Sequence, residues 1–228
     1  MNKKVIVLSL GGSLIFPKEV DVNFLREFKK VVNANKGRYK FIVVCGGGSV
    51  ARKYIMALRK TGVDKKTQSL AGISATRMNA RFVSYFFGMD QKRGIPHRIG
   101  TIRRLLKKQD VVFCGALKYK PKQTSDSTAA EIAKKFKADF VNLTNVKGLH
   151  DKNPKTNKNV KFIPRISWKD FDKMANKIGF KPGQHFVLDQ TASGIIMKNK
   201  IPTYIIKSMK QLDNLLKGKR FVGTTISD

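Results

Sequence analysis

The sequence predicts an α/β fold in which a mostly parallel β-sheet is covered on both faces by helices. Two observations lead to this prediction. Short apolar runs of the length of buried strands recur along the 228 residues, and segments with helical period separate them. Because strands that alternate with helices tend to pair in parallel and to be buried on both faces, a sheet between two helical layers follows.

Each predicted strand is a short apolar run. The runs are residues 5–10, 41–44, 110–114, 140–143 and 202–206. Apolar side chains recur at intervals of three and four residues around residues 24–32 and again around residues 132–136, which predicts helices there. Residues 67–89 predict one long helix, and the polar stretch from 150 to 163 predicts a surface loop.

A chain of this length can form one large α/β domain or two small lobes. The change from the apolar run at 140–143 to the polar loop suggests where a second lobe begins. We therefore expect an amino-terminal lobe over residues 1–141 and a carboxy-terminal lobe over residues 142–228. The two lobes would share a continuous sheet and make up one domain.

The composition is strongly basic, with 47 lysine and arginine residues against 15 aspartate and glutamate residues and a formal net charge of +32. Such a charge favours polyanionic ligands and non-specific contact with nucleic acid. The basic residues are spread along the whole chain, however, and no RNA- or DNA-binding motif occurs. A solvated basic surface is therefore the preferred interpretation, and non-specific nucleic-acid binding stays open.

Nothing in the sequence indicates a membrane protein. No apolar run approaches the roughly 20 residues that span a bilayer. The apolar part of the first strand is also too short for a secretory signal, so we expect a cytoplasmic protein. Cys45 and Cys114 each end an apolar run beside a glycine, outside any CxxC or Cys/His pattern, which predicts two small buried residues rather than a disulfide.

Two junctions between a predicted strand and a predicted helix are rich in glycine. Residues 11–13 read Gly-Gly-Ser, and residues 46–48 read Gly-Gly-Gly. Glycines let the backbone approach a ligand closely, and the free N–H groups at a helix start attract anions. Arg52 lies one turn into the second helix, where its guanidinium can reach a phosphate. Two such junctions suggest two phosphates and therefore phosphoryl transfer, although neither is a P-loop or a dinucleotide-binding fingerprint.

Three further segments carry polar residues at the end of a predicted strand or at a helix start. Residues 123–128 form a hydroxyl-rich turn around Asp126, which can donate to phosphate oxygens and hold a carboxylate beside them. Residues 144–150 follow a buried strand, and Asp189 precedes another predicted helix. Each aspartate could instead serve only as a helix cap, and His150 alone is more typical of a surface or core histidine.

Taken together and in this order, these segments resemble the amino acid kinase superfamily, and within it most closely the archaeal-type uridylate kinases. The motifs that carry the resemblance extend over almost the whole chain: Leu10-Gly11-Gly12-Ser13, Val44-Cys45-Gly46-Gly47-Gly48, Ala51-Arg52-Lys53-Tyr54, residues 72–80 (GISATRMNA), Thr124-Ser125-Asp126, Thr144-Asn145-Val146 with Gly148, Leu188-Asp189-Gln190-Thr191-Ala192 and Gly223-Thr224-Thr225-Ile226. The resemblance implies the amino acid kinase fold.

The resemblance also implies a nucleoside monophosphate kinase. A phosphate oxygen of UMP would attack the γ-phosphate of ATP in line and give UDP and ADP without a covalent enzyme intermediate, as a step of pyrimidine nucleotide biosynthesis. Mg²⁺ would accompany ATP, held mainly by water and phosphate and without a metal site made by the protein. Members of the family are usually hexamers built from dimers, which implies a homo-oligomer.

The functional residues of the family transfer to matching positions of this sequence. The catalytic residues would be Asp126, Asp189 and Arg52. ATP would be bound by Gly11, Gly12, Ser13, Gly48, Arg52, Thr144, Asn145, Gly148, His150 and Asn153. UMP would be bound by Gly47, Arg52, Ser69, Gly72, Thr76, Gly115 and Thr124.

Two positions depart from the family pattern. Ser9 stands in the first strand where many members carry a lysine that bridges the transferring phosphoryl group. Ser69 stands where an aspartate commonly binds the ribose of the acceptor. Two alternative functions therefore stay open: an enzyme of the same fold with another small acceptor, or a weakly active relative that binds nucleotide or nucleic acid.

Overall fold

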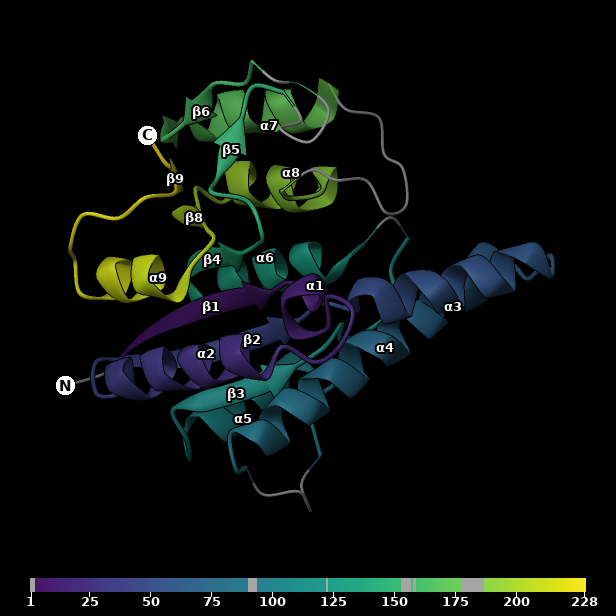
Figure 1. Cartoon of the computed structure of the whole chain (residues 1–228). Coiled ribbons are helices and arrows are strands. Elements are labelled where there is room, and N and C mark those ends of the chain that lie inside the picture. Colours follow the sequence, from purple (N-terminus) through teal and green to yellow (C-terminus); the bar gives the residue numbers. More distant parts are fainter. Residues whose placement is uncertain (1–2, 90–93, 122, 153–156, 158, 178–186) are drawn as a thin grey trace.

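The computed structural model describes residues 3–89, 94–121, 123–152, 157, 159–177 and 187–228 (Figure 1). The strands are β1 (Lys4–Leu10), β2 (Tyr39–Cys45), β3 (Val111–Cys114), β4 (Asp139–Leu143), β5 (Leu149–His150), β6 (Phe162–Ile163), β7 (Arg165–Ile166), β8 (Thr203–Ile206) and β9 (Thr224–Ile226). The helices are α1 (Gly12–Ile15), α2 (Val22–Asn35), α3 (Gly48–Lys60), α4 (Lys65–Phe86), α5 (Ile99–Leu106), α6 (Ser125–Phe136), α7 (Trp168–Lys177), α8 (Gln190–Lys198) and α9 (Met209–Leu216).

Seven strands form one sheet in the order β3-β2-β1-β4-β8-β9-β7, and β5 pairs with β6 in a separate hairpin. The five strands β1, β2, β3, β4 and β8 are parallel, as predicted, so their carboxyl ends meet at one edge of the sheet. β9 is antiparallel to β8. The two- and three-residue strands β5, β6, β7 and β9 are too short for a periodic pattern, and the sequence does not predict them. The lobe boundary predicted after residue 141 falls inside β4, within this continuous sheet.

Helices cover both faces of the sheet. α2, α4 and α9 pack on one face, and α5, α6, α7 and α8 pack on the other. In β1, Leu8 and Leu10 face the first layer, whereas Val7 faces the second, because successive side chains of a strand point to opposite faces. By the same alternation Ser9 points to the face that α6 covers, which decides its partner in the site.

The long helix predicted over residues 67–89 is α4, which both begins and ends earlier than expected. Asp64 caps its start by accepting hydrogen bonds from the N–H groups of Lys66 and Thr67 at 2.8 and 3.1 Å. α3 packs along α4, and the two helices extend together beyond the sheet (Figure 1). Among the described residues, neither α4 nor any other helix is long and apolar enough to cross a membrane.

Cys45 and Cys114 are both fully buried free thiols, as predicted. They end the neighbouring strands β2 and β3 but belong to the apolar layers on opposite faces of the sheet. Burial raises the pKa of the Cys114 thiol to about 12. Both residues are therefore inert core side chains beneath the glycine turns.

Candidate active site

The two glycine turns touch each other through their backbones at the carboxyl ends of β1 and β2. A Cβ atom added to Gly12 would lie 2.2 Å from the Gly48 nitrogen and 2.6 Å from the Gly46 oxygen. Gly48 has a φ of +61°, which L side chains rarely adopt. The Gly46 N–H also donates to the Leu10 oxygen at 2.9 Å, which ties the second turn to β1. Only residues without side chains permit this approach, so the contact explains why both junctions are glycine.

Helix α3 begins at the second turn without a side chain over its first N–H groups. Its N-cap is Gly47, which supplies no capping side chain, and the first turn contains no acidic residue. These N–H groups and the positive end of the helix dipole attract an anion. Arg52 lies one turn further along α3, as the sequence predicts, and its side chain is exposed. Ser13 lies half-buried in α1, just beyond Gly12 in the first turn.

Ser9 and Asp126 form the polar centre of the site. Ser9 is fully buried in β1, and its hydroxyl donates a hydrogen bond to Asp126 Oδ1 at 2.7 Å. Asp126 lies partly buried in the first turn of α6. Burial, together with the negative charge of Asp189, raises the pKa of Asp126 to about 7, and the hydrogen bond from Ser9 opposes this rise. The partner of Asp126 on β1 is thus a neutral hydroxyl rather than a cation.

Thr124 joins the two aspartates. Its hydroxyl donates to Asp189 Oδ2 at 2.5 Å, and the same oxygen accepts the N–H of Asp126 at 3.1 Å. Asp189 is 7% exposed and caps α8 by accepting the N–H of Ala192 at 2.8 Å. The cap of α6 is Thr124, not Asp126, so Asp126 is free of the capping role that was its alternative. The start of α6 also reaches the glycine turn, since a Cβ on Gly46 would lie 3.4 Å from Ser125 Oγ.

Most residues predicted to border the acceptor come together around the second turn. A Cβ on Gly47 would lie 3.4 Å from Thr76 Cγ2 and 3.5 Å from the Gly72 oxygen. A Cβ on Gly115 would lie 2.6 Å from Thr76 Oγ1, and the N–H of Ala116 donates to that oxygen at 2.9 Å. Gly47, Gly72, Thr76 and Gly115 therefore form one packed cluster between α3, α4 and the end of β3.

Ser69 does not join this cluster through its hydroxyl. It lies half-buried on α4, and its Oγ donates to the Lys65 oxygen of the same helix at 2.8 Å. A serine hydroxyl in a helix commonly turns back to its own backbone in this way. The side chain at the position expected to bind the ribose of the acceptor thus has its donor engaged locally.

The residues predicted for the adenosine side follow β4. The Thr144 N–H donates to the Ile206 oxygen at 3.0 Å, which holds the end of β4 beside β8, and Asn145 is exposed. Gly148 has a φ of +155°, and a Cβ there would lie 2.6 Å from Thr224 Oγ1. The His150 ring lies 5.6 Å from that of Phe162, centroid to centroid. Asn153 lies outside the described residues.

Sequence reasoning missed three side chains that shape these surfaces. Thr224 Oγ1 accepts the N–H of Leu149 at 2.8 Å and donates to the Ile163 oxygen at 2.6 Å, which fixes the hairpin that carries His150. Arg77 and Asn79 donate to backbone oxygens of the loops after β3 and β2. All three lie in motifs that the sequence displays, but a bond from a side chain to a distant carbonyl leaves no local pattern.

Comparison with known proteins assigns the family. A model of the amino acid kinase family matches residues 4–207. The chain belongs to the amino acid kinase family. Uridylate kinase of Methanoregula boonei is 32% identical over 95% of this chain and 93% of that protein, and uridylate kinase of Archaeoglobus fulgidus is 33% identical over 97% and 99%.

Solved structures agree with this assignment to the amino acid kinase family. The crystal structure of uridylate kinase from Archaeoglobus fulgidus matches with a TM-score of 0.83 at 33% identity, over 97% of this chain and 99% of that one. UMP kinase from Ureaplasma parvum matches with a TM-score of 0.81 at 20% identity, over the full length of both chains. The second match shows that the fold is shared well beyond close relatives.

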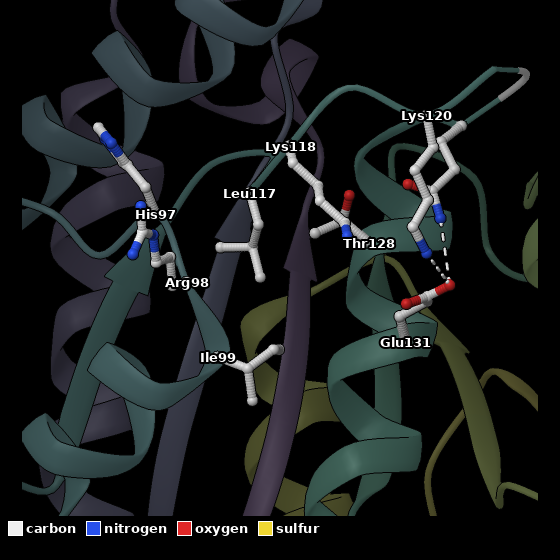
Figure 2. Close-up of a pocket in the computed structure, with 9 residues that line it drawn as sticks. His97, Arg98, Ile99, Leu117, Lys118, Lys120, Thr128 and Glu131 are labelled. Carbon is white, nitrogen blue, oxygen red and sulfur yellow. Dashed lines mark hydrogen bonds and ion pairs between the residues drawn. The ribbon is translucent and has the colours of Figure 1, made fainter.

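A groove of about 210 Å³ lies beside the site of this amino acid kinase, between the start of α5 and α6. Figure 2 shows Glu131 of α6 facing the loop after β3, where it accepts from Lys120 Nζ at 2.6 Å and from Gln123 Nε2 at 3.3 Å. Lys118 lines the same groove. Lys118 and Lys120 thus lie on the α5 and α6 side of the loop, with Lys120 paired to Glu131.

Proposed function

We propose that this amino acid kinase is a uridylate kinase, which transfers the γ-phosphoryl group of ATP to UMP and releases UDP and ADP. The observation that carries the proposal is the backbone contact between Gly12 and residues 46–48, because two helix starts then lie side by side next to Asp126. The relatives called uridylate kinases, matched over nearly their whole length, support UMP as the acceptor. We expect the enzyme to act in the cytoplasm, in pyrimidine nucleotide biosynthesis.

In this proposal the two turns divide the phosphates between them. Gly11, Gly12, Ser13 and Gly48 would contact the phosphates of ATP, and Gly47 with Arg52 would hold the phosphate of UMP. The contacts of the two glycines support the division, since Gly48 faces Gly12 whereas Gly47 faces Gly72 and Thr76. Gly72, Thr76, Gly115 and Thr124 would border the remainder of the acceptor.

The chemical step needs positioning and charge more than proton transfer. A UMP phosphate is largely a dianion at neutral pH, so one of its oxygens supplies the attacking electron pair without a general base. The new bond to the γ-phosphorus forms as the bond from that phosphorus to the β–γ bridging oxygen breaks, and ADP leaves with that electron pair. Arg52 would offset negative charge on the acceptor phosphate and on the transferring group. Asp126, which accepts a hydrogen bond from Ser9, would orient the cationic groups around the transferring group.

The carboxylates of Asp126 and Asp189, which Thr124 links, would suit a hydrated Mg²⁺ bound mainly through ATP. No three His, Cys, Asp or Glu side chains come together as a metal site in the part of the chain that the structure describes. Asp126 and Asp189 would instead hold water molecules of the ion, as carboxylates do for Mg²⁺ that phosphates bind directly. When bound, the ion supplies positive charge at the phosphate oxygens.

The carboxy-terminal lobe, residues 142–228, would bind the adenosine part of ATP. Thr144 and Asn145 follow β4, and Gly148 brings the backbone close to Thr224. His150, at the end of β5, offers a ring for stacking on the base. Residues 1–141 would then form the acceptor lobe, with the phosphates at the edge where both lobes contribute strands.

An acceptor screen tests the proposal. Purified protein with ATP and Mg²⁺ is offered UMP, other nucleoside monophosphates and small phosphate or carboxylate acceptors, and ADP release is measured. UMP should give the highest kcat/KM, and Asp126→Asn and Arg52→Ala should lower it. Thermal unfolding adds a binding measurement, since a ligand at 100 times its Kd stabilises by about 2.7 kcal/mol.

Two outcomes would replace the proposal. Stabilisation by ATP without stabilisation by UMP, together with turnover of a different acceptor, would favour another small-molecule kinase. The local hydrogen bond of Ser69 is the observation that motivates this alternative, because it leaves the ribose of UMP without the family's carboxylate. Salt-sensitive binding of RNA without any ADP release would favour a nucleic-acid-binding relative. The observation that suggests this alternative is the net charge of +32.

We further propose that the enzyme is a homo-oligomer, a hexamer if it follows the resemblance. Met78, Phe82 and Tyr85 recur at helical spacing along α4 and are 51%, 37% and 39% exposed, which is unusual for side chains of this size. Sedimentation velocity measures the assembly directly. A Phe82→Lys variant should shift it toward smaller species, and a wild-type monomer would contradict the proposal.

A further inference from the structure

Helix α4 is bonded to both loops that border the proposed acceptor. Asn79 is 6% exposed, and its Nδ2 donates to the Gly46 oxygen at 2.7 Å. Arg77 Nε donates to the Ala116 oxygen at 3.1 Å, and its Nη2 donates to the Leu117 oxygen at 2.6 Å. Thr76 accepts the N–H of Ala116 between them. One segment of four residues thus connects the turn after β2 with the loop after β3.

The geometry of the peptide bond gives these contacts a consequence for the site. In a trans peptide the carbonyl and the following N–H point in opposite directions. The bond from Asn79 turns the Gly46 carbonyl toward α4, and it therefore turns the Gly47 N–H away from α4. The bonds from Arg77 likewise direct the N–H groups of Leu117 and Lys118 to the opposite side. Each side chain thus sets the direction of a backbone donor without itself reaching the ligand.

The far end of the loop after β3 is held independently of α4. Glu131 bonds Lys120 and Gln123, and Thr124 caps α6. Loss of the Arg77 bonds should therefore release only the start of the loop. Loss of the Asn79 bond should release the peptide between Gly46 and Gly47. The N–H of Gly46 would still donate to the Leu10 oxygen of β1.

We propose that Asn79 and Arg77 are positioning residues for phosphoryl transfer, which orient the backbone donors of the acceptor side through the carbonyls of Gly46, Ala116 and Leu117. The inference rests on the proposed uridylate kinase activity. It assigns Asn79 to the glycine turn that the two substrates share, and Arg77 to the acceptor alone. A merely structural role would predict loss of stability without any change in the kinetics of the folded enzyme.

Asn79→Ala tests the first assignment, with Asn35→Ala as its matched control. Asn35 is also a buried asparagine whose Nδ2 donates to a backbone oxygen, that of Val31 at 2.9 Å, but it lies on α2 away from both turns. Both variants should lose stability. Only Asn79→Ala should raise KM for UMP and lower kcat, together by about 10- to 100-fold in kcat/KM. Equal kinetics for the two folded variants would overturn the assignment.

Arg77→Lys tests the second assignment, with Arg81→Lys one turn further along α4 as its control. Lysine keeps the charge but cannot donate to two carbonyls in the fixed geometry of a guanidinium. Arg77→Lys should raise KM for UMP by about tenfold and leave KM for ATP unchanged. An unchanged KM for UMP would overturn it, and so would an equal rise for both substrates. This variant also carries the test should Asn79→Ala fail to fold.

The wild-type enzyme separates the inference from the function on which it rests. A wild type that releases no ADP with UMP contradicts the proposed function. A wild type that turns over UMP, beside variants that match their controls, contradicts the positioning roles alone. Stabilisation by ATP, measured by thermal unfolding in all four variants, shows that the donor side remains intact.

Discussion

The two sides of the carboxyl edge of the sheet differ in how much backbone and how much side chain they present. On the side of β1, β2 and β3 the backbone itself makes the surface, and added Cβ atoms on Gly12, Gly47 and Gly115 would come within 2.2, 2.4 and 2.6 Å of other atoms. On the side of β4, β5 and β9 the backbone also comes close at Gly148, but side chains contribute more. There Thr224 links two backbone segments, and His150 packs near Phe162.

The difference follows from what each side has to recognise. A phosphate offers the same oxygens in every nucleotide, and backbone N–H groups at a helix start meet them without regard to the base. A base differs between ligands, and its recognition by side chains can change without rebuilding the fold. The departure at Ser69 fits this division, since both glycine turns are kept while a side chain expected to bind the ribose differs.

The sharpest way to break the comparison is Gly12→Ala. Its Cβ would collide with backbone atoms of the second turn, which have no flexible end that could move aside. We expect kcat/KM to fall by about 100-fold or more and the unfolding free energy to fall by about 1–3 kcal/mol. Gly100→Ala on α5 is the control, because nothing lies within 4 Å of its added Cβ. That control should gain up to about 1 kcal/mol, and a Gly12→Ala enzyme with normal kinetics would refute the account of the turns.

Asp126→Asn should have the next largest effect. Removal of the charge that is proposed to orient cationic groups at the reacting centre should lower kcat by about 100-fold. KM for ATP and UMP should change far less, because the backbone turns remain. A variant with wild-type kcat would show that the carboxylate is a structural group only.

The same variant tests the raised pKa of Asp126 by its pH dependence. In the folded state this carboxyl takes up a proton near pH 7, whereas in the unfolded chain it does so near pH 4. The folded state therefore binds more protons between these values, and the unfolding free energy should fall as the pH rises, by up to about 1.4 kcal/mol per pH unit. Asp126→Asn should abolish this slope. For activity the sign is opposite: kcat should rise through pH 7 as the carboxylate ionises.

Ser9→Ala should sharpen the comparison with a smaller effect. The Ser9 hydroxyl favours the ionised form of Asp126, so its loss should move the rise of kcat to a higher pH. At pH 7 we expect about a tenfold loss of kcat. Ser193→Ala is a close control, because the Ser193 hydroxyl is also fully buried and donates to an aspartate, Asp172, at 2.7 Å. Both variants should lose about 1 kcal/mol of stability, and an identical pH profile in Ser9→Ala would count against the role of Ser9.

His150→Ala should have the smallest effect, confined to the donor. Loss of a stacking ring costs about 0.5–1.5 kcal/mol, which corresponds to a rise in KM for ATP of about two- to tenfold. Neither kcat nor KM for UMP should change. A change in KM for UMP instead would mean that the two sides of the edge are assigned the wrong way round.

Sequence reasoning went furthest where structure imposes periodicity or glycine. The five parallel strands and the two helical layers could be predicted, because a buried strand must be apolar and because strands that alternate with helices tend to pair in parallel. The start of α4 was misjudged, since Asp64 caps the helix ahead of the first apolar position that shows a period. Strands β5, β6, β7 and β9 could not be predicted, because two or three residues are too few to show an alternation of apolar and polar side chains.

Within the site, the limit was set by contacts that cross the fold. The pairing of Ser9 with Asp126 spans 117 positions, and that of Thr124 with Asp189 spans 65. The sequence marked all four residues but could not show that Ser9 faces α6 or that Thr124, rather than Asp126, is the cap. Asn79 and Arg77 donate hydrogen bonds to backbone carbonyl oxygens. Every residue has such an oxygen, so the type of the accepting residue does not reveal the bond.

The contact between Gly12 and Gly48 has a consequence for changing what this enzyme accepts. If the two turns bind the phosphates as proposed, their main-chain contact would fix the distance between the donor and acceptor phosphates, and no surface substitution could increase that distance. Directed evolution toward new acceptors should therefore succeed with molecules that present a phosphate at the same spacing, by variation at Ser69 and in the loop that begins at Leu117. Acceptors with a more distant nucleophile would call for a different pair of turns, and hence for a different protein.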